Sequence, residues 1–285
     1  MSLFGFSALA SDQTQQADPE FDARVDQPAY ATDGPTIVFD EAHNNFHTPE
    51  LRYRPLADLL KNDGYKIESN REPFTKESLA RHKILVIANA MGSDQKHHPA
   101  FTDAENDVVY EWIQNGGALL LIADHFPMGH AAHALAKRLG VDLSRGMTTD
   151  YTLTAENGLN VSHPIMKGRS DKETIHTVRT FTGEALQGPT GNGWLLRTPV
   201  GSTELIPDFA DPENRKKDKR VPSMHPDQGA AFKLGKGRVV VLGEAGIFTA
   251  QVVNGKQFGM NVPATDNKQF ALNVMHWLSG LLPEE

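Results

Sequence analysis

The sequence predicts an α/β fold built on a doubly wound, mostly parallel sheet, with a β-rich insertion in its second half. Short apolar runs alternate with amphipathic segments from residue 36 to residue 140, and the connections between them are short. Hydrophobic residues make up 39% and charged residues 22% of the chain, as in ordinary globular proteins. The 285 residues are enough for one large α/β domain or two small ones.

The first elements follow from apolar periodicity. Residues 36–39 are β-branched or aromatic, as in a buried strand, which predicts a first strand at 36–40. Residues 50–62 carry leucines at helical spacing, and an Asp-Gly pair stops that helix. A second strand is predicted at 65–69, a short helix at 76–81 and a third strand at 83–88.

The next helix has clear boundary signals. Residues 102–105 resemble a capping box, which predicts a helix that continues to residue 113. The Asn-Gly-Gly sequence at 115–117 ends it. A fourth strand at 118–123 leads directly into a helix at 129–139.

The second half is less regular. Segments 160–168, 175–181 and 194–198 are predicted to be β structure joined by loops. Residues 230–242 read as a hairpin that turns at Gly-Lys-Gly, with its second strand in the main sheet. A final amphipathic helix is predicted over 268–278.

The N-terminus favours export. Residues 3–10 are apolar and end in Ala-Leu-Ala before a polar stretch, which resembles the end of a signal peptide. We therefore expect residues 1–34 to be a signal-peptide remnant followed by an extended arm, and residues 35–285 to be one domain with its insertion at about 145–230. The expected location is periplasmic or secreted, with the cytoplasm as the alternative. No later segment reaches the roughly 20 apolar residues that a membrane span needs.

Charge and cysteine content exclude several classes of function. The net charge of −8 argues against a nucleic-acid partner or an anionic membrane partner, either of which favours a basic face. The one basic cluster, at residues 215–220, alternates with acids and reads as a solvated loop. Because the chain has no cysteine, a thiol nucleophile, a thiolate metal site and a disulfide are all excluded.

Acidic residues follow three of the predicted strands. Asp40 and Glu41 follow the first strand, Asp124 follows the fourth, and Glu244 follows the strand at 238–243. If these strands are parallel in one sheet, the acids converge at one edge, where ligands bind in open α/β sheets. Each acid alone could instead cap a helix or accept backbone N–H groups.

Histidines near these acids predict a divalent metal, either zinc, manganese or iron. The expected metal ligands are Asp40, His43, His47 and His125, and the expected catalytic groups are Glu41, Glu244 and Asp124, of which Asp124 is also a possible ligand.

Four further residues are candidates for substrate binding. Asn44 and Asn45 could bond a hydroxyl-rich ligand or simply form a tight turn. Arg52 could bind a carboxylate or phosphate, or only neutralise the nearby acids. His130 sits on a helix beside alanines, where packing or solvent exposure is the alternative to a binding role.

The fourth strand and its helix resemble a known family. The segment LLIADHFPMGH at 120–130, continuing to AKRLG at 136–140, is similar to the nucleophile-elbow segment of class I glutamine amidotransferase-like domains. The Gly-Gly turn before this strand and the Ser-His-Pro-Ile segment at 162–165 look similar too. The body of the chain thus resembles an uncharacterised bacterial branch of that superfamily, and the resemblance implies a flavodoxin-like architecture.

The chain departs from this family at the nucleophile. The position of the catalytic cysteine falls on Pro127, so glutamine hydrolysis through a thioester is excluded.

The sequence is compatible with three functions. The first is a metal-assisted hydrolase that acts on a small polar or carbohydrate substrate. The second is a metal-free glycosidase with Glu41 and Glu244 as its carboxylate pair. The third is a non-catalytic ligand-binding or envelope-assembly module that has lost the amidotransferase chemistry. Composition does not predict an oligomeric state.

Overall fold

The computed structural model describes residues 16–93, 99–189, 191 and 193–284. Its centre is a nine-stranded mixed sheet formed within these residues. The strands lie in the order β3 (Lys66–Asn70), β2 (Thr36–Asp40), β4 (Ile84–Ala88), β5 (Ala118–Ile122), β14 (Gly237–Leu242), β13 (Asp227–Leu234), β9 (Leu186–Gln187) and β6 (Asp142–Leu143), and β10 (Trp194–Arg197) also pairs with β13. The strands from β3 to β14 are parallel, and the remaining pairs are antiparallel.

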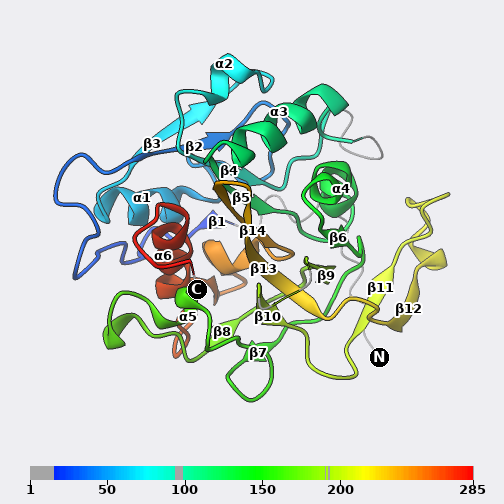
Figure 1. The fold of residues 1–285 in the computed structure, drawn as a ribbon. Coiled ribbons are helices and arrows are strands. Elements are labelled where there is room, and N and C mark those ends of the chain that lie inside the picture. The colour runs from blue at the N-terminus through cyan, green and yellow to red at the C-terminus, as the bar shows by residue number, and fades with distance from the viewer. Residues whose placement is uncertain (1–15, 94–98, 190, 192, 285) are drawn as a thin grey trace.

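Helices cover both faces of the sheet (Figure 1). Alternate residues of a strand point to opposite faces, so Ile37 of β2 packs in one core and its neighbour Val38 packs in the other. The first core includes α1 (Arg54–Asn62) and α6 (Asn267–Leu278), and α5 (Pro164–Lys167) lies beside α6. The second core includes α2 (Lys76–Leu79), α3 (Asp103–Gln114) and α4 (Met128–Arg138). The predicted α/β class is confirmed.

Three smaller β units lie outside the main sheet in the described part of the chain. They are the pair β7 (Thr152–Leu153) and β8 (Val178–Arg179), the pair β11 (Thr203–Ile206) and β12 (Lys219–Pro222), and a sheet of β1 (Gln16–Ala17), β15 (Ala250–Val253) and β16 (Lys256–Gly259). Three short 3-10 helices lie at Asp171–Glu173, Arg215–Lys217 and Gly246–Phe248.

The element predictions hold best where periodicity is strong. The hairpin of β13 and β14 is confirmed, and its turn pairs Leu234 with Gly237. The β prediction for 160–168 is wrong, because Pro164 begins the short helix α5 and His163 caps it by accepting the Ile165 N–H.

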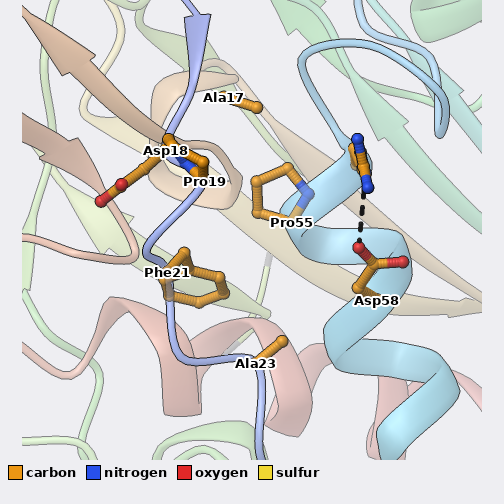
Figure 2. Close-up of a pocket in the computed structure, with 8 residues that line it drawn as sticks. Ala17, Asp18, Pro19, Phe21, Ala23, Pro55 and Asp58 are labelled. Carbon is orange, nitrogen blue, oxygen red and sulfur yellow. Dashed lines mark ion pairs between the residues drawn. The ribbon is translucent and has the colours of Figure 1, made fainter.

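The arm at residues 18–34 lies against α1 and α6. The Asn62 side chain donates to the Ala23 carbonyl at 2.8 Å, and the Lys268 ammonium donates to the Asp22 carbonyl at 2.7 Å. A pocket of about 200 Å³ lies between the arm and α1. Figure 2 shows Phe21 on one side of it and Pro55 on the other. The predicted signal-peptide remnant at 3–10 lies outside the described residues, and the domain division stays a prediction. No helix in the described part of the chain is both long and apolar enough to cross a membrane.

Candidate functional site

The predicted acids lie at one edge of the sheet but form two separate groups. Because β2, β5 and β14 run parallel, the carboxyl ends of these strands lie at the same edge: Asp40 is the last residue of β2, and Asp124 and Glu244 follow the ends of β5 and β14. Asp124 and Glu244 follow adjacent strands, whereas β2 is separated from β5 by β4. Each group therefore has its own neighbours and its own chemistry.

The first group, which we call the His43 cluster, consists of Asp40, His43 and Glu105. The His43 ring lies between the two carboxylates, with Nδ1 2.9 Å from both Asp40 oxygens and Nε2 2.9 Å from Glu105 Oε1. All three residues are buried. Both ring nitrogens are thus engaged, and neither has a lone pair directed at a metal ion.

Local structure explains this cluster. Glu105 is the third residue of α3, where its Oε2 accepts the N–H and hydroxyl of Thr102 in a capping box, as the sequence predicts. The His43 ring also packs between Phe74 and Phe101, with centroid separations of 4.8 and 4.7 Å.

The electrostatics of the His43 cluster favour a charged ring. Burial opposes protonation of His43, but the hydrogen bonds and charges of Asp40 and Glu105 outweigh it and raise the His43 pKa. Burial acts against ionised Glu105 as well, yet its hydrogen bonds from Thr102 and His43 lower the Glu105 pKa. The cluster is an internal ion triad that joins the loop after β2 to α3.

The second group, which we call the acid pair, consists of Asp124 and Glu244. Burial raises the pKa of Asp124 to about 7, and burial together with the Asp124 charge raises that of Glu244 to about 8. The two carboxyl groups titrate as a unit, because ionising one opposes ionising the other.

Glu244 is held by the backbone. Its Oε2 accepts the N–H groups of Phe181 and Gly183 at 2.8 and 3.0 Å, and its Oε1 accepts that of Gly246 at 2.7 Å. These bonds fasten the loop at 181–183 to the end of β14. Tyr53, from the start of α1, completes the surroundings by donating its hydroxyl to the Ala245 carbonyl at 2.9 Å.

A third buried acid, Glu184, lies next to the acid pair. Its Oε2 accepts the Arg145 N–H at 2.5 Å, and its Oε1 has no hydrogen-bond partner in the described part of the chain. Burial and the charges of Asp124 and Glu204 raise the Glu184 pKa well above its usual range. Glu184 packs against Gly129, where an added Cβ would come within 2.3 Å of Oε1.

Asn89 links His47 to the acid pair. It follows β4 with a φ of 51°, and its side-chain amide donates to His47 Nδ1 at 3.2 Å. Its side-chain oxygen accepts the Asp124 N–H at 2.9 Å. Burial, with a smaller effect of the Arg52 charge, lowers the His47 pKa to about 3, so His47 is neutral.

His125 is the most accessible of the predicted metal ligands. Its side chain is 30% exposed, compared with 8% for His43. His125 Nδ1 lies 2.9 Å from the Phe126 carbonyl, and the other nitrogen lies 3.9 Å from Asp124. Burial lowers the His125 pKa, so the neutral ring donates from Nδ1.

Glu41 faces away from the acid pair. It accepts the Ser69 hydroxyl at 2.6 Å and the Arg71 guanidinium at 3.1 Å, both on the side of β3. Glu244 follows β14, three strand spacings from β2, which is about 14 Å at roughly 4.8 Å per spacing. A glycosidase pair needs about 5 to 9.5 Å, so the predicted pairing of Glu41 with Glu244 lacks the required geometry.

The predicted binding residues form local contacts. Asn44 donates to the Gly92 carbonyl at 2.5 Å, and Asn45 accepts the His43 N–H at 3.2 Å. The Arg52 guanidinium lies 3.8 Å from the Phe46 ring centroid. The His130 ring stacks on the Phe209 ring, with centroids 5.9 Å apart.

Within the described residues, no group of three or more His, Asp and Glu side chains is arranged to hold a metal ion. The divalent metal stays a prediction. A second pocket, of about 400 Å³, lies between α2 and α3 and is lined by Lys76, His82 and Trp112 among others. Neither this pocket nor the one in Figure 2 is lined by Asp124 or Glu244.

Three residues of the site were missed at the sequence level: Glu105, Asn89 and Glu184. Glu105 carried a signal, because it was part of the predicted capping box, but its contact with His43 spans 62 positions. Asn89 follows a predicted strand directly. Glu184 lies in the irregular half, where no periodicity marks it.

Part of the chain matches the model of a known protein family. The family model of the IFT52 GIFT domain matches residues 36–127, which is less than half of the chain. No curated protein sequence shows significant similarity to the chain.

Solved structures extend the likeness. The mmIFT52 N-terminal domain has a TM-score of 0.60 at 16% identity, over 85% of this chain and 97% of that domain. A ThuA-like protein from Bacteroides uniformis ATCC 8492 has a TM-score of 0.47 at 14% identity, over 89% of this chain and 93% of that protein. At these identities the mmIFT52 likeness describes the fold alone.

These findings correct three expectations. The matching family is that of the IFT52 GIFT domain, so the inferred membership of the glutamine amidotransferase-like superfamily is wrong. The same match to the IFT52 GIFT domain contradicts the expected hydrolase class and the expected periplasmic or secreted location. The elbow resemblance misled because a strand that turns into a helix is common to many parallel α/β folds.

Proposed function

We propose that the chain is a non-catalytic module that binds a protein partner in a larger assembly. The observation that carries this proposal is the Glu244 carboxylate, which accepts three backbone N–H groups and so braces the carboxyl edge of the sheet. The His43 cluster has the same character, since both ring nitrogens hold other parts of the chain. The match of residues 36–127 to a domain of a transport-complex protein supports a protein partner. We also propose that the fold is a doubly wound, flavodoxin-like variant.

The hairpin of β11 and β12 is the surface that we assign to the partner. Three exposed apolar side chains lie on it or beside it: Val200 at 108%, Met224 at 85% and Phe209 at 39% exposure. Val200 and Met224 flank the paired ends of the two strands, where the Ser223 N–H donates to the Ser202 carbonyl. Apolar side chains gathered on a protruding two-stranded unit are typical of protein interaction sites. We therefore expect a partner with a complementary apolar surface.

Site-specific photo-crosslinking in living cells tests the proposal. A photoreactive residue at Met224 is expected to capture a discrete protein, and the Met224→Asp variant is expected to lose that protein from its native complex. The control position is Leu281, which is 38% exposed near the other end of the chain. Equal capture at Leu281 and Met224, or an unchanged complex in Met224→Asp, contradicts the assignment.

An activity screen tests the proposal that the module is non-catalytic. We expect no turnover of nitrophenyl esters, phosphates or glycosides by the purified protein, with or without added zinc or manganese. Turnover that disappears in Asp124→Asn, while the fold is retained, would overturn the proposal.

A further inference from the structure

A half-buried arginine, Arg145, lies just after β6 at the side of α4. Its guanidinium carbon is 4.5 Å from the centroid of the Phe209 ring. Its Nε is buried and has no hydrogen-bond partner in the described part of the chain. Arginine carries its charge at all ordinary pH values, so this group has unused capacity to donate a hydrogen bond.

Two histidines from α4 lie in the same place. His133 Nδ1 is also buried without a hydrogen-bond partner among the described residues. Burial, followed by the Arg145 charge, lowers the His133 pKa. The His130 ring stacks on Phe209 at an interplanar angle of 22°, so Phe209 contacts both His130 and Arg145.

The nearby acids do not neutralise this group. Glu184 accepts the Arg145 backbone N–H rather than a guanidinium N–H, and burial raises its pKa, which disfavours its charged form. Asp142 is paired with Lys137 at 3.1 Å and with His225 at 3.3 Å. Arg145 thus adds positive charge at the side of α4, in a protein whose net charge is −8.

We propose that Arg145, His130 and His133, with the Phe209 ring beside them, bind the phosphate or carboxylate group of a small soluble ligand. A guanidinium fork matches the geometry of either oxyanion. His130 lies in the first turn of α4, where the helix dipole also favours a negative charge. Phe209 borders both the ligand site and the hairpin surface, but the inference does not depend on the proposed function, because Arg145, His130 and His133 are not part of the hairpin surface and the test needs no protein partner.

The backbone at Arg145 permits a sharp test. Its φ of 61° is in the left-handed region, which glycine adopts more readily than any other residue. Arg145→Gly therefore removes the guanidinium without straining the backbone, and thermal unfolding checks that the variant is folded. In isothermal titration calorimetry, inorganic phosphate or citrate is expected to bind the wild-type protein saturably, and Arg145→Gly is expected to weaken that binding by about tenfold or more.

Arg197→Gln is the matched control. Arg197 also stacks on an aromatic ring, that of Trp194 at 4.2 Å, but it is paired with Asp227 at 2.9 Å. This variant is expected to bind like wild type. The phosphate and citrate titrations distinguish the two oxyanions, and binding of either one supports the proposal. Absence of saturable binding of both, or full binding by Arg145→Gly, overturns it, and neither outcome depends on a protein partner.

Discussion

The His43 cluster and the acid pair lie at the same edge of the sheet, yet they stabilise buried charge in opposite ways. In the His43 cluster a cationic ring lies between two carboxylates, so each charge has a partner of opposite sign. In the acid pair two carboxyl groups are neighbours, and protonation together with backbone N–H groups replaces a counter-ion. Residue type at a strand end therefore does not define a role, because the neighbours decide whether an acid is ionised.

The largest expected effect comes from removing the cation of the His43 cluster. His43→Ala leaves two buried carboxylates without a counter-charge and opens space between Phe74 and Phe101. We expect a loss of about 3–5 kcal/mol in the free energy of unfolding, measured by urea denaturation. His176→Ala, at an exposed histidine, is the control and should change stability by about 0.5 kcal/mol or less. Similar losses in both variants would contradict the ion-triad description.

The second prediction concerns the pH dependence of the acid pair. The folded pKa values, about 7 for Asp124 and about 8 for Glu244, lie above those of unfolded chains, so the folded state binds more protons across that interval. The free energy of unfolding should therefore fall as pH rises from about 4 to about 8.

Asp124→Asn removes half of this pair while keeping an oxygen that accepts the His125 N–H. We expect the variant to match wild type near pH 4 and to exceed it by about 2–4 kcal/mol at pH 8, in urea titrations at each pH, because the unfolded Asp124 carboxyl ionises above about pH 4. The pH dependence of stability that remains in Asp124→Asn includes a contribution from His43. The raised pKa of His43 adds stability that is lost as pH rises through that pKa. Parallel curves for the two proteins would show that Asp124 is ionised throughout.

Sequence reasoning succeeded where the cause was local. The strand at 118–122 and the capping box of α3 depend on residues within a few positions of each other, and both are confirmed. The convergence of Asp124 and Glu244 also followed from parallel strands. The contact of His43 with Glu105 and the position of Glu184 depend on loops that no periodicity describes. The division of the site into two groups is therefore visible only in the three-dimensional structure.

A smaller effect is expected at the helix caps. Thr102 and Thr75 both cap a helix through a capping box, but only Thr102 also donates to a carboxylate that holds His43. Thr102→Ala should cost about 1–2 kcal/mol, and Thr75→Ala, at the four-residue helix α2, should cost about 0.5 kcal/mol. Differential scanning calorimetry measures both, and Thr102→Ser should restore most of the loss. Equal costs at the two caps would mean that Thr102 has no influence on the His43 cluster.

The smallest effect is expected at Glu41, the immediate neighbour of Asp40. The side chains of these two consecutive residues point to different sides. Asp40 contacts His43, whereas Glu41 contacts Ser69 and Arg71. The Arg71 side chain is 65% exposed, so water screens its pair with Glu41. Glu41→Gln should therefore change the free energy of unfolding by about 0.5 kcal/mol or less, whereas Asp40→Asn should approach the loss seen in His43→Ala. If Glu41→Gln instead cost as much as Asp40→Asn, Glu41 would belong to the His43 cluster, and the two groups at the sheet edge could no longer be treated as separate.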